Sequence, residues 1–130
     1  MVRSVTWGGQ NAADIGVVAK RHGVVLLLQF GSTVTGRTHP HSDLDLAVLL
    51  EHVPLAFDAM ADLVGDLQAL VPGQPVDVAI LNHADPLFLR RVTDDARLLC
   101  GSPTRLAELK LYAFKRYQDY RPYLAFEREY

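Results

Sequence analysis

The sequence predicts an α/β domain built around one small sheet that is flanked by helices. Two observations support this fold class: apolar runs typical of strands alternate with segments of helical periodicity, and the chain is short. Because the chain has 130 residues, 49% of them hydrophobic and 22% charged, we expect one globular domain, 1–130. The single cysteine, Cys100, excludes an internal disulfide and a cysteine-based zinc site.

The first half of the chain contains two predicted helices and two predicted strands. Residues 10–22 are expected to form a helix that ends at Gly23, and the apolar run 24–30 predicts a buried strand. A polar turn region follows, and residues 44–50 form the second predicted strand. Apolar side chains at helical spacing then indicate a helix over residues 54–70.

The second half repeats the alternation of strands and helices. Val76, Val78 and Ile80 recur at every second position, and this alternation predicts a third strand over 76–81. A short helix is expected over 86–95, with a proline in its first turn, and residues 97–100 predict a short fourth strand. The last helix begins at residues 102–103, and Pro122 is expected to end or kink it.

Acidic residues are concentrated in the middle of the chain. Residues 40–96 contain ten acidic and two basic side chains, although the whole chain has a formal net charge of only −2. This distribution excludes a uniformly basic nucleic-acid binder, so direct binding to nucleic acid is not expected. The apolar runs are far shorter than the ~20 residues that span a bilayer, and the first residues show no signal-peptide pattern. We therefore expect a cytoplasmic protein that does not contact membranes.

Two aspartates open the second predicted strand. Because alternate side chains of a strand point to opposite faces, Asp43 and Asp45 share one face and Leu44, Leu46 and Val48 the other. Like charges side by side repel and are costly to desolvate, and a divalent cation removes both costs because carboxylate oxygens are natural Mg²⁺ ligands. The alternative is a solvated strand end, where aspartate is a common turn residue.

The third predicted strand carries an aspartate in the same manner. Asp77 points away from the apolar face of residues 76–80, and an acid inside so apolar a strand is unusual. A position beside Asp43 and Asp45 on a neighbouring strand explains it, because three carboxylates can hold two metal ions. The alternative is an aspartate on an edge strand that faces water.

A glycine and a serine follow the first predicted strand directly. Gly31 lets the backbone approach a ligand closely, and Ser32 is a good N-cap for about one turn of helix. Free N–H groups at a helix N-terminus bind phosphate. An ordinary strand-to-helix turn is the alternative for this pair taken alone.

Taken together, these residues resemble the polymerase β superfamily of nucleotidyltransferases. The resemblance rests on Gly31-Ser32, on Asp43-x-Asp45 ten residues later, and on Asp77 in a later apolar strand. Within that superfamily the chain is similar to the minimal nucleotidyltransferases (MNT), which are small antitoxins paired with HEPN ribonuclease toxins. The resemblance implies a mixed sheet, two Mg²⁺ ions and ATP as the substrate.

The resemblance also implies a reaction and a role for each residue. AMP would pass from ATP to a tyrosine hydroxyl of the partner HEPN toxin, which silences the toxin. The Gly31 backbone and Ser32 would hold the β- and γ-phosphates. Asp43 and Asp45 would bridge the metal ions, and Asp77 would bind the catalytic metal and act as general base toward the attacking hydroxyl. A hetero-oligomer of antitoxin and toxin is compatible with this reaction.

The turn after Gly-Ser departs from the family's pattern. Relatives often carry an arginine there that pairs with phosphate, whereas this chain has Thr33-Val34-Thr35. Arg37 follows Gly36 and is the candidate nucleotide-binding substitute, with a solvated loop arginine as the alternative.

Two other functions are compatible with the same residues. The chain could neutralise a toxin by contact alone, with vestigial carboxylates, or it could transfer a nucleotide to a small molecule, although such enzymes usually need more chain for the acceptor. Outside the motif, Arg90 and Arg91 are interpreted as a pair on a helix surface, with a partner contact as the alternative. Among the residues after 111, Tyr117 and Tyr120 lie on an apolar stripe and are expected in the core, whereas the other aromatic and basic residues are typical of an interface.

Overall fold

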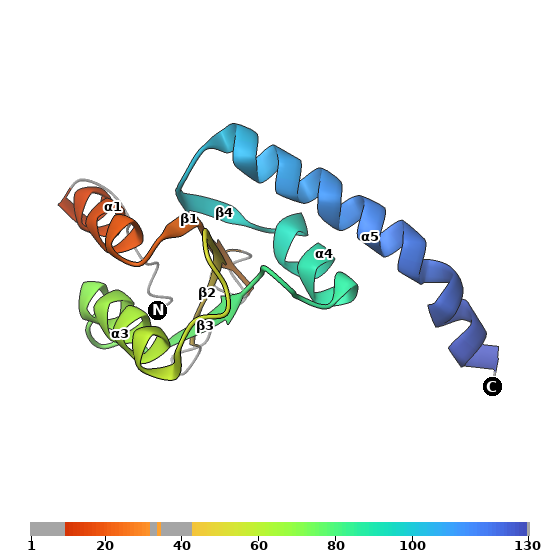
Figure 1. The fold of residues 1–130 in the computed structure, drawn as a ribbon, viewed down its shortest axis with the longest axis horizontal. Helices are drawn as coiled ribbons and strands as arrows, with labels where there is room; N and C mark the ends of the chain where they lie inside the picture. The colour runs from red at the N-terminus through yellow and green to blue at the C-terminus, as the bar shows by residue number, and fades with distance from the viewer. Residues whose placement is uncertain (1–9, 32–33, 35–42, 130) are drawn as a thin grey trace.

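The computed structural model describes residues 10–31, 34 and 43–129, with side chains described for residues 13–122 of these ranges. Four strands and four labelled helices follow one another in chain order (Figure 1). The elements are α1 (Gln10–Arg21), β1 (Val24–Phe30), β2 (Leu44–Leu50), α3 (Phe57–Leu70), β3 (Val76–Ile80), α4 (Pro86–Asp94), β4 (Arg97–Cys100) and α5 (Pro103–Glu129). The predicted α/β domain with one small sheet is therefore confirmed.

The sheet is mixed, as the family resemblance implies. Its strand order is β3-β2-β1-β4. β1 pairs antiparallel with both β2 and β4, whereas β2 and β3 run parallel. The parallel pair is possible because α3 connects β2 to β3, and a parallel connection needs a crossover of this kind.

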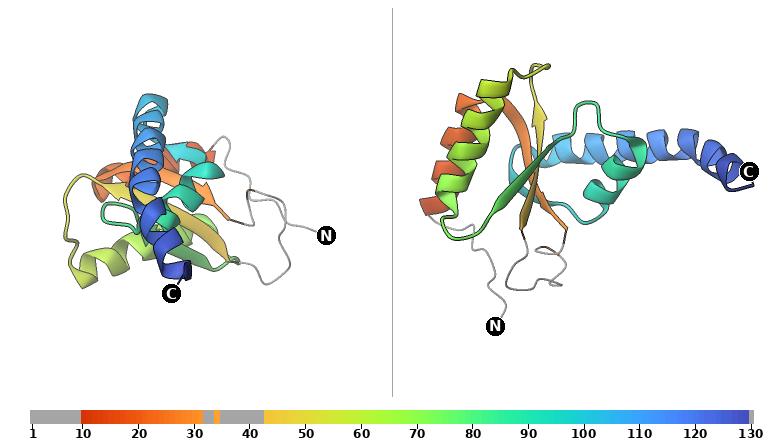
Figure 2. Two further views of the ribbon diagram at one scale, coloured as in Figure 1. Left: turned by 90° about the vertical axis from the view of Figure 1, so that its right-hand side faces the viewer. Right: turned by 90° about the horizontal axis from the view of Figure 1, so that it is seen from below.

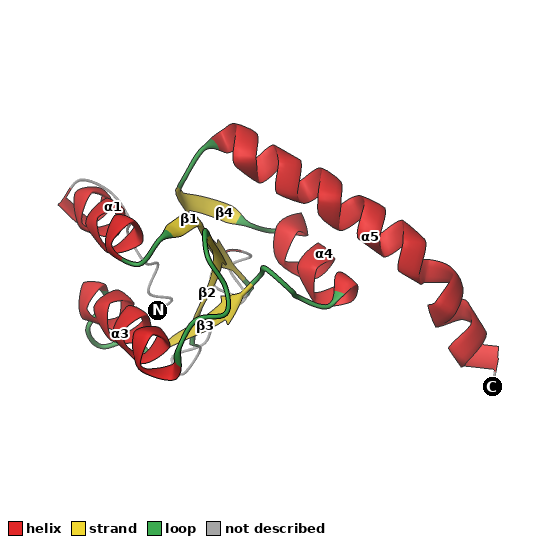
Figure 3. Ribbon diagram, viewed as in Figure 1, coloured by secondary structure: helices red, strands yellow, loops and turns green. Residues whose placement is uncertain are grey.

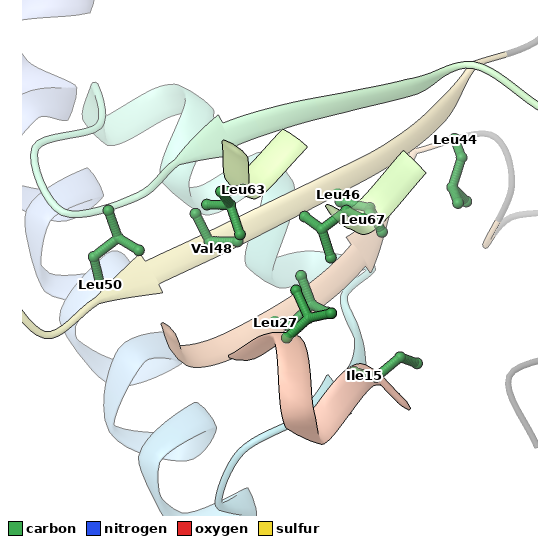
Figure 4. Packing of buried hydrophobic residues seen from close by; sticks show 9 residues of the cluster. Ile15, Leu27, Leu44, Leu46, Val48, Leu50, Leu63 and Leu67 are labelled. Carbon is green, nitrogen blue, oxygen red and sulfur yellow. The ribbon is translucent and has the colours of Figure 1, made fainter. Parts of the chain in front are cut away.

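Helices cover both faces of the sheet. α1 and α3 lie on one side of the sheet and α4 and α5 on the other (Figures 1 to 3). The apolar face of β2 packs on the α1–α3 side, where Leu44, Leu46 and Val48 meet Leu63 and Leu67 of α3 (Figure 4). The opposite face of the sheet packs against α4 and α5. Since both faces are covered, the strands can be as apolar as their sequences indicate.

α3 begins three residues later than expected, and three elements end one residue earlier than expected: α1 at Arg21, β3 at Ile80 and α4 at Asp94. α3 begins at Phe57 rather than at residue 54, because Ala56 is extended (φ −62°, ψ 151°) while Val53 and Leu55 pack against the core. α5 continues through Pro122 to Glu129, so this proline does not end the helix, and the expected alternative, a kink, agrees with the path of its last turns. The last turns of α5 change direction in Figure 1, and the helix extends beyond the other elements.

A polar contact joins α1 to α3. The Nε2 atom of His22 lies 2.6 Å from Oδ2 of Asp66, and Nη1 of Arg21 lies 3.3 Å from the same oxygen. The hydrogen bond with His22, followed by the contact with Arg21, holds the pKa of Asp66 below its ordinary value of 3.8. The carboxylate therefore stabilises the folded chain at every pH above 3.8, and this contribution is lost as the pH falls through the lowered pKa.

We expect Asp66→Asn to unfold at a lower urea concentration than the wild type at neutral pH, because the charged partner of Arg21 and His22 is removed. The difference should shrink as the pH falls below 3.8, where the wild-type carboxylate also becomes protonated. Asp62→Asn, which changes an exposed aspartate one turn earlier on α3, is the control and should leave stability nearly unchanged. A difference between Asp66→Asn and wild type that stays constant over the whole pH series would contradict this interpretation.

Candidate functional site

Three of the aspartates singled out by the sequence lie at one end of the sheet. β1 finishes there, and β2 and β3 begin there. Asp45 of β2 is the direct neighbour of Asp77 on β3 and of Phe30 on β1. We call this region, made of Phe30, Gly31, Asp43, Asp45 and Asp77, the carboxylate end of the sheet.

The three carboxylates share the face of the sheet that α4 and α5 cover. Leu44, Leu46 and Val48 belong to the core on the α1–α3 side, whereas Ala47 belongs to the core on the α4–α5 side. Side chains alternate along a strand, so Asp43 and Asp45 lie on the same face as Ala47. Asp77 lies on that face too, because parallel neighbours in register point the same way.

Burial and nearby negative charges both act on the Asp45 carboxyl group. Partial burial, followed by the negative charges of Asp77 and Asp43, raises the pKa of Asp45 above its ordinary value of 3.8. The positive charge of Arg91 opposes this rise. Asp43 and Asp77 are exposed and Asp45 is half-buried. An unneutralised carboxylate thus stands between two others, which is unfavourable without a cation.

The donor set fits a hard divalent cation, although the side chains do not converge on one point. Carboxylate oxygens are the ligands that Mg²⁺ prefers, and all three lie on one face at one end of the sheet. Within residues 10–31, 34 and 43–129, no three His, Cys, Asp or Glu side chains are gathered closely enough to hold a metal ion.

A glutamine that the sequence analysis did not single out holds the start of β3. The Nε2 atom of Gln68 on α3 donates to the carbonyls of Val71 (3.2 Å) and Gln74 (2.7 Å), and its Oε1 accepts from the Val76 amide (2.9 Å). The Leu44 amide donates to the carbonyl of Pro75 at 2.8 Å. These bonds fasten the two residues before Asp77, Val76 to α3 and Pro75 to the first residue of β2. The signal in the sequence is only a polar residue next to buried Leu67, which many helices show.

Gly31 is in close contact with the Asp45 carboxylate. Its φ of +78° lies in the left-handed region, and a Cβ atom placed on it would overlap Oδ2 of Asp45. The Val34 amide donates to the Gly31 carbonyl at 3.1 Å, so the chain turns directly after β1. Glycine is needed here for both reasons, since a side chain would be strained and would displace the carboxylate. Ser32 and Arg37, the other predicted nucleotide-binding residues, lie outside the described residues.

Comparisons with known proteins identify the family and the fold of the chain. Residues 14–105 match the family described as "Polymerase beta, Nucleotidyltransferase". A crystal structure of a toxin–antitoxin with AMP-PNP contains a chain that is 23% identical, with a TM-score of 0.76, and the match covers 92% of this chain and 97% of that one. The comparison with curated proteins gives no match.

Two further solved structures share the fold. A chain of the tri-AMPylated Shewanella oneidensis HEPN toxin in complex with MNT antitoxin is 21% identical, with a TM-score of 0.70, and the match covers 92% of this chain and 94% of that one. A chain of the toxin–antitoxin MntA-HepT is 20% identical, also with a TM-score of 0.70, and the coverage is 92% and 95%. At these identities the likeness establishes the fold.

The contact between Gly31 and Asp45 can be tested by substitution. We expect Gly31→Ala to lower the free energy of unfolding by about 1–2 kcal/mol, because alanine is strained at positive φ and its Cβ displaces the carboxylate. Gly65→Ala is the matched control: it lies inside α3, where a new Cβ meets nothing within 4 Å, so it should raise stability by about 0.5–1 kcal/mol. Urea unfolding measures both, and a Gly31→Ala variant as stable as wild type would refute the contact.

Proposed function

The chain belongs to the polymerase beta nucleotidyltransferase family, and we propose that it is an MNT-type antitoxin that transfers AMP from ATP to a tyrosine hydroxyl of a HEPN ribonuclease toxin. We further propose that residues 1–130 form one nucleotidyltransferase domain that acts in the cytoplasm. The observation that carries the proposal is the pairing of Asp45 with Asp77, with Asp43 on the same face and Gly31 in contact with Asp45.

The fold likeness supports the choice of partner and of reaction. The structures that share this fold include a toxin–antitoxin with AMP-PNP and a tri-AMPylated HEPN toxin in complex with MNT antitoxin. Among the described residues no helix is both long and apolar enough to cross a lipid bilayer.

The acceptor is a protein in this proposal, so the partner supplies the acceptor-binding surface that a small domain lacks.

In the proposed reaction the tyrosine oxygen forms a bond to the α-phosphorus, and the bond from that phosphorus to the α–β bridging oxygen breaks. Pyrophosphate leaves with the electron pair of the broken bond. Asp77 accepts the proton of the hydroxyl as general base. The backbone at Gly31 and the hydroxyl of Ser32 orient the β- and γ-phosphates, and Arg37 is retained as a candidate phosphate contact.

Asp43, Asp45 and Asp77 are the residues that would hold Mg²⁺. When bound, the two ions would neutralise phosphate charge and lower the pKa of the attacking hydroxyl. The chain's own contribution is to hold Asp45 and Asp77 at paired positions of adjacent strands, with Asp43 directly before β2.

Labelled ATP tests this function directly. With Mg²⁺ and [α-³²P]ATP, the wild-type chain should label a HEPN protein from the same genome, and Asp43→Asn or Asp77→Asn should reduce the rate by about 100-fold or more. Asp58→Asn, an exposed aspartate in the first turn of α3, is the control and should label normally.

The same assay separates the alternative functions. Labelling that is unchanged in both Asp43→Asn and Asp77→Asn would refute the proposed site. If the wild type labels no toxin and Asp77→Asn still inhibits toxin ribonuclease activity as well as wild type does, the chain acts by binding alone.

A further inference from the structure

Arg91 lies near the carboxylates because of how α4 is connected. It occupies the last turn of α4, and only two residues separate that helix from β4. β4 begins with Arg97 opposite Gln29 of β1, one residue before Phe30. Since Phe30 is the direct neighbour of Asp45, the end of α4 is held at the carboxylate end of the sheet.

A ring contact sets which side of α4 faces the carboxylates. Phe88 packs edge-to-face against Phe30, with ring centroids 5.8 Å apart and an interplanar angle of 87°. Residues three apart on a helix lie on the same side, so Arg91 projects beside Phe88. Leu89 and Val92 are buried against the sheet and fix the rotation of the helix. Arg91 thus stands at the edge of α4 that borders Asp45.

Arg90, the residue before Arg91, contacts Tyr117 and Asp94. The Arg90 guanidinium lies 4.3 Å from the centroid of the Tyr117 ring, and its Nε lies 3.6 Å from Oδ2 of Asp94. Arg90 also lines a groove between α4 and α5 with Lys110 and Phe114. Arg91 is exposed, and among the described residues it belongs to none of the ion pairs. The two arginines, adjacent in sequence, therefore point to different sides of α4.

The position of Arg91 suits a phosphate better than a carboxylate. Asp45, one of the three carboxylates assigned to cations, lies close enough to Arg91 for their charges to interact. A fixed positive charge next to a cation site is favourable when an anion is bound together with the cations. A guanidinium matches the geometry of phosphate oxygens and can bind two of them at once.

We propose that Arg91 is a nucleotide-binding residue whose guanidinium pairs with the phosphates of the bound nucleoside triphosphate. This inference rests on the proposed nucleotidyltransferase function and adds a residue to the site from α4. It replaces the interpretation of Arg91 as one of a pair of surface arginines. Arg91 contacts substrate in this proposal, and its removal should weaken binding of the triphosphate even where no acceptor is present.

Calorimetric titration with α,β-methylene-ATP and Mg²⁺ tests the proposal without turnover, because carbon replaces the oxygen whose bond would break. We expect Arg91→Ala to bind this analogue about tenfold more weakly or worse, since a charge-assisted hydrogen bond is lost. Arg91→Lys keeps the positive charge but loses the planar guanidinium that can bind two oxygens at once. Its affinity for the analogue should fall between those of the wild type and Arg91→Ala. Arg105→Ala removes an exposed arginine at the start of α5 and should bind like wild type.

Titration with Mn²⁺ alone distinguishes phosphate binding from simple charge balance. If Arg91 contacts phosphate, Arg91→Ala should bind Mn²⁺ at least as tightly as wild type, because a repelling cation is removed. The role of Arg91 is overturned if Arg91→Ala binds the analogue as tightly as the wild type does. It is also overturned if Arg91→Ala loses affinity for Mn²⁺ and for the analogue to the same extent. No binding of the analogue by the wild type overturns the proposed function as well.

Discussion

The repulsion between Asp45 and Asp77 is the interaction on which the rest of the site depends. Direct neighbours on adjacent strands bring like charges together, which costs about 0.2–1 kcal/mol when nothing neutralises them. The fold keeps this arrangement by burying Leu44, Leu46 and Val48 on the opposite face of β2. Burial of such side chains stabilises by about 1.5–3 kcal/mol each, so the apolar face readily outweighs the repulsion. β2 and β3 thus place two carboxylates side by side at a position where a bound cation would neutralise their charges.

Residues from several elements that are distant in sequence position the carboxylates. Gln68 on α3 holds the backbone just before Asp77, and Gly31 leaves room for the Asp45 carboxylate after β1. From the other side, the contact between Phe88 and Phe30 holds α4 against the same end of the sheet. The site therefore belongs to the whole small domain, and α4 contributes to it as well as the strands that carry the motif.

Much of the fold and the carboxylate set could be predicted because alternation along a strand is a local property. It places Asp43 and Asp45 on one face from the sequence alone, whereas the register of β2 against β3, which brings Asp77 beside Asp45, is set by long-range pairing. The roles of Gln68 and Arg91 depend on tertiary contacts and leave no local pattern. The continuation of α5 past Pro122 likewise has no local signal. Ser32 and Arg37 remain predictions.

The dependence of unfolding free energy on Mg²⁺ tests the central claim, that the Asp45–Asp77 pair is an unfavourable charge arrangement built for a cation. In chelator, Asp77→Asn should be more stable than wild type by about 0.2–1 kcal/mol, because the repulsion is removed. Millimolar Mg²⁺ should stabilise the wild type through binding to the folded state and leave Asp77→Asn unchanged. An Asp77→Asn variant that is less stable than wild type in chelator, with equal stabilisation of both proteins by Mg²⁺, would contradict the claim.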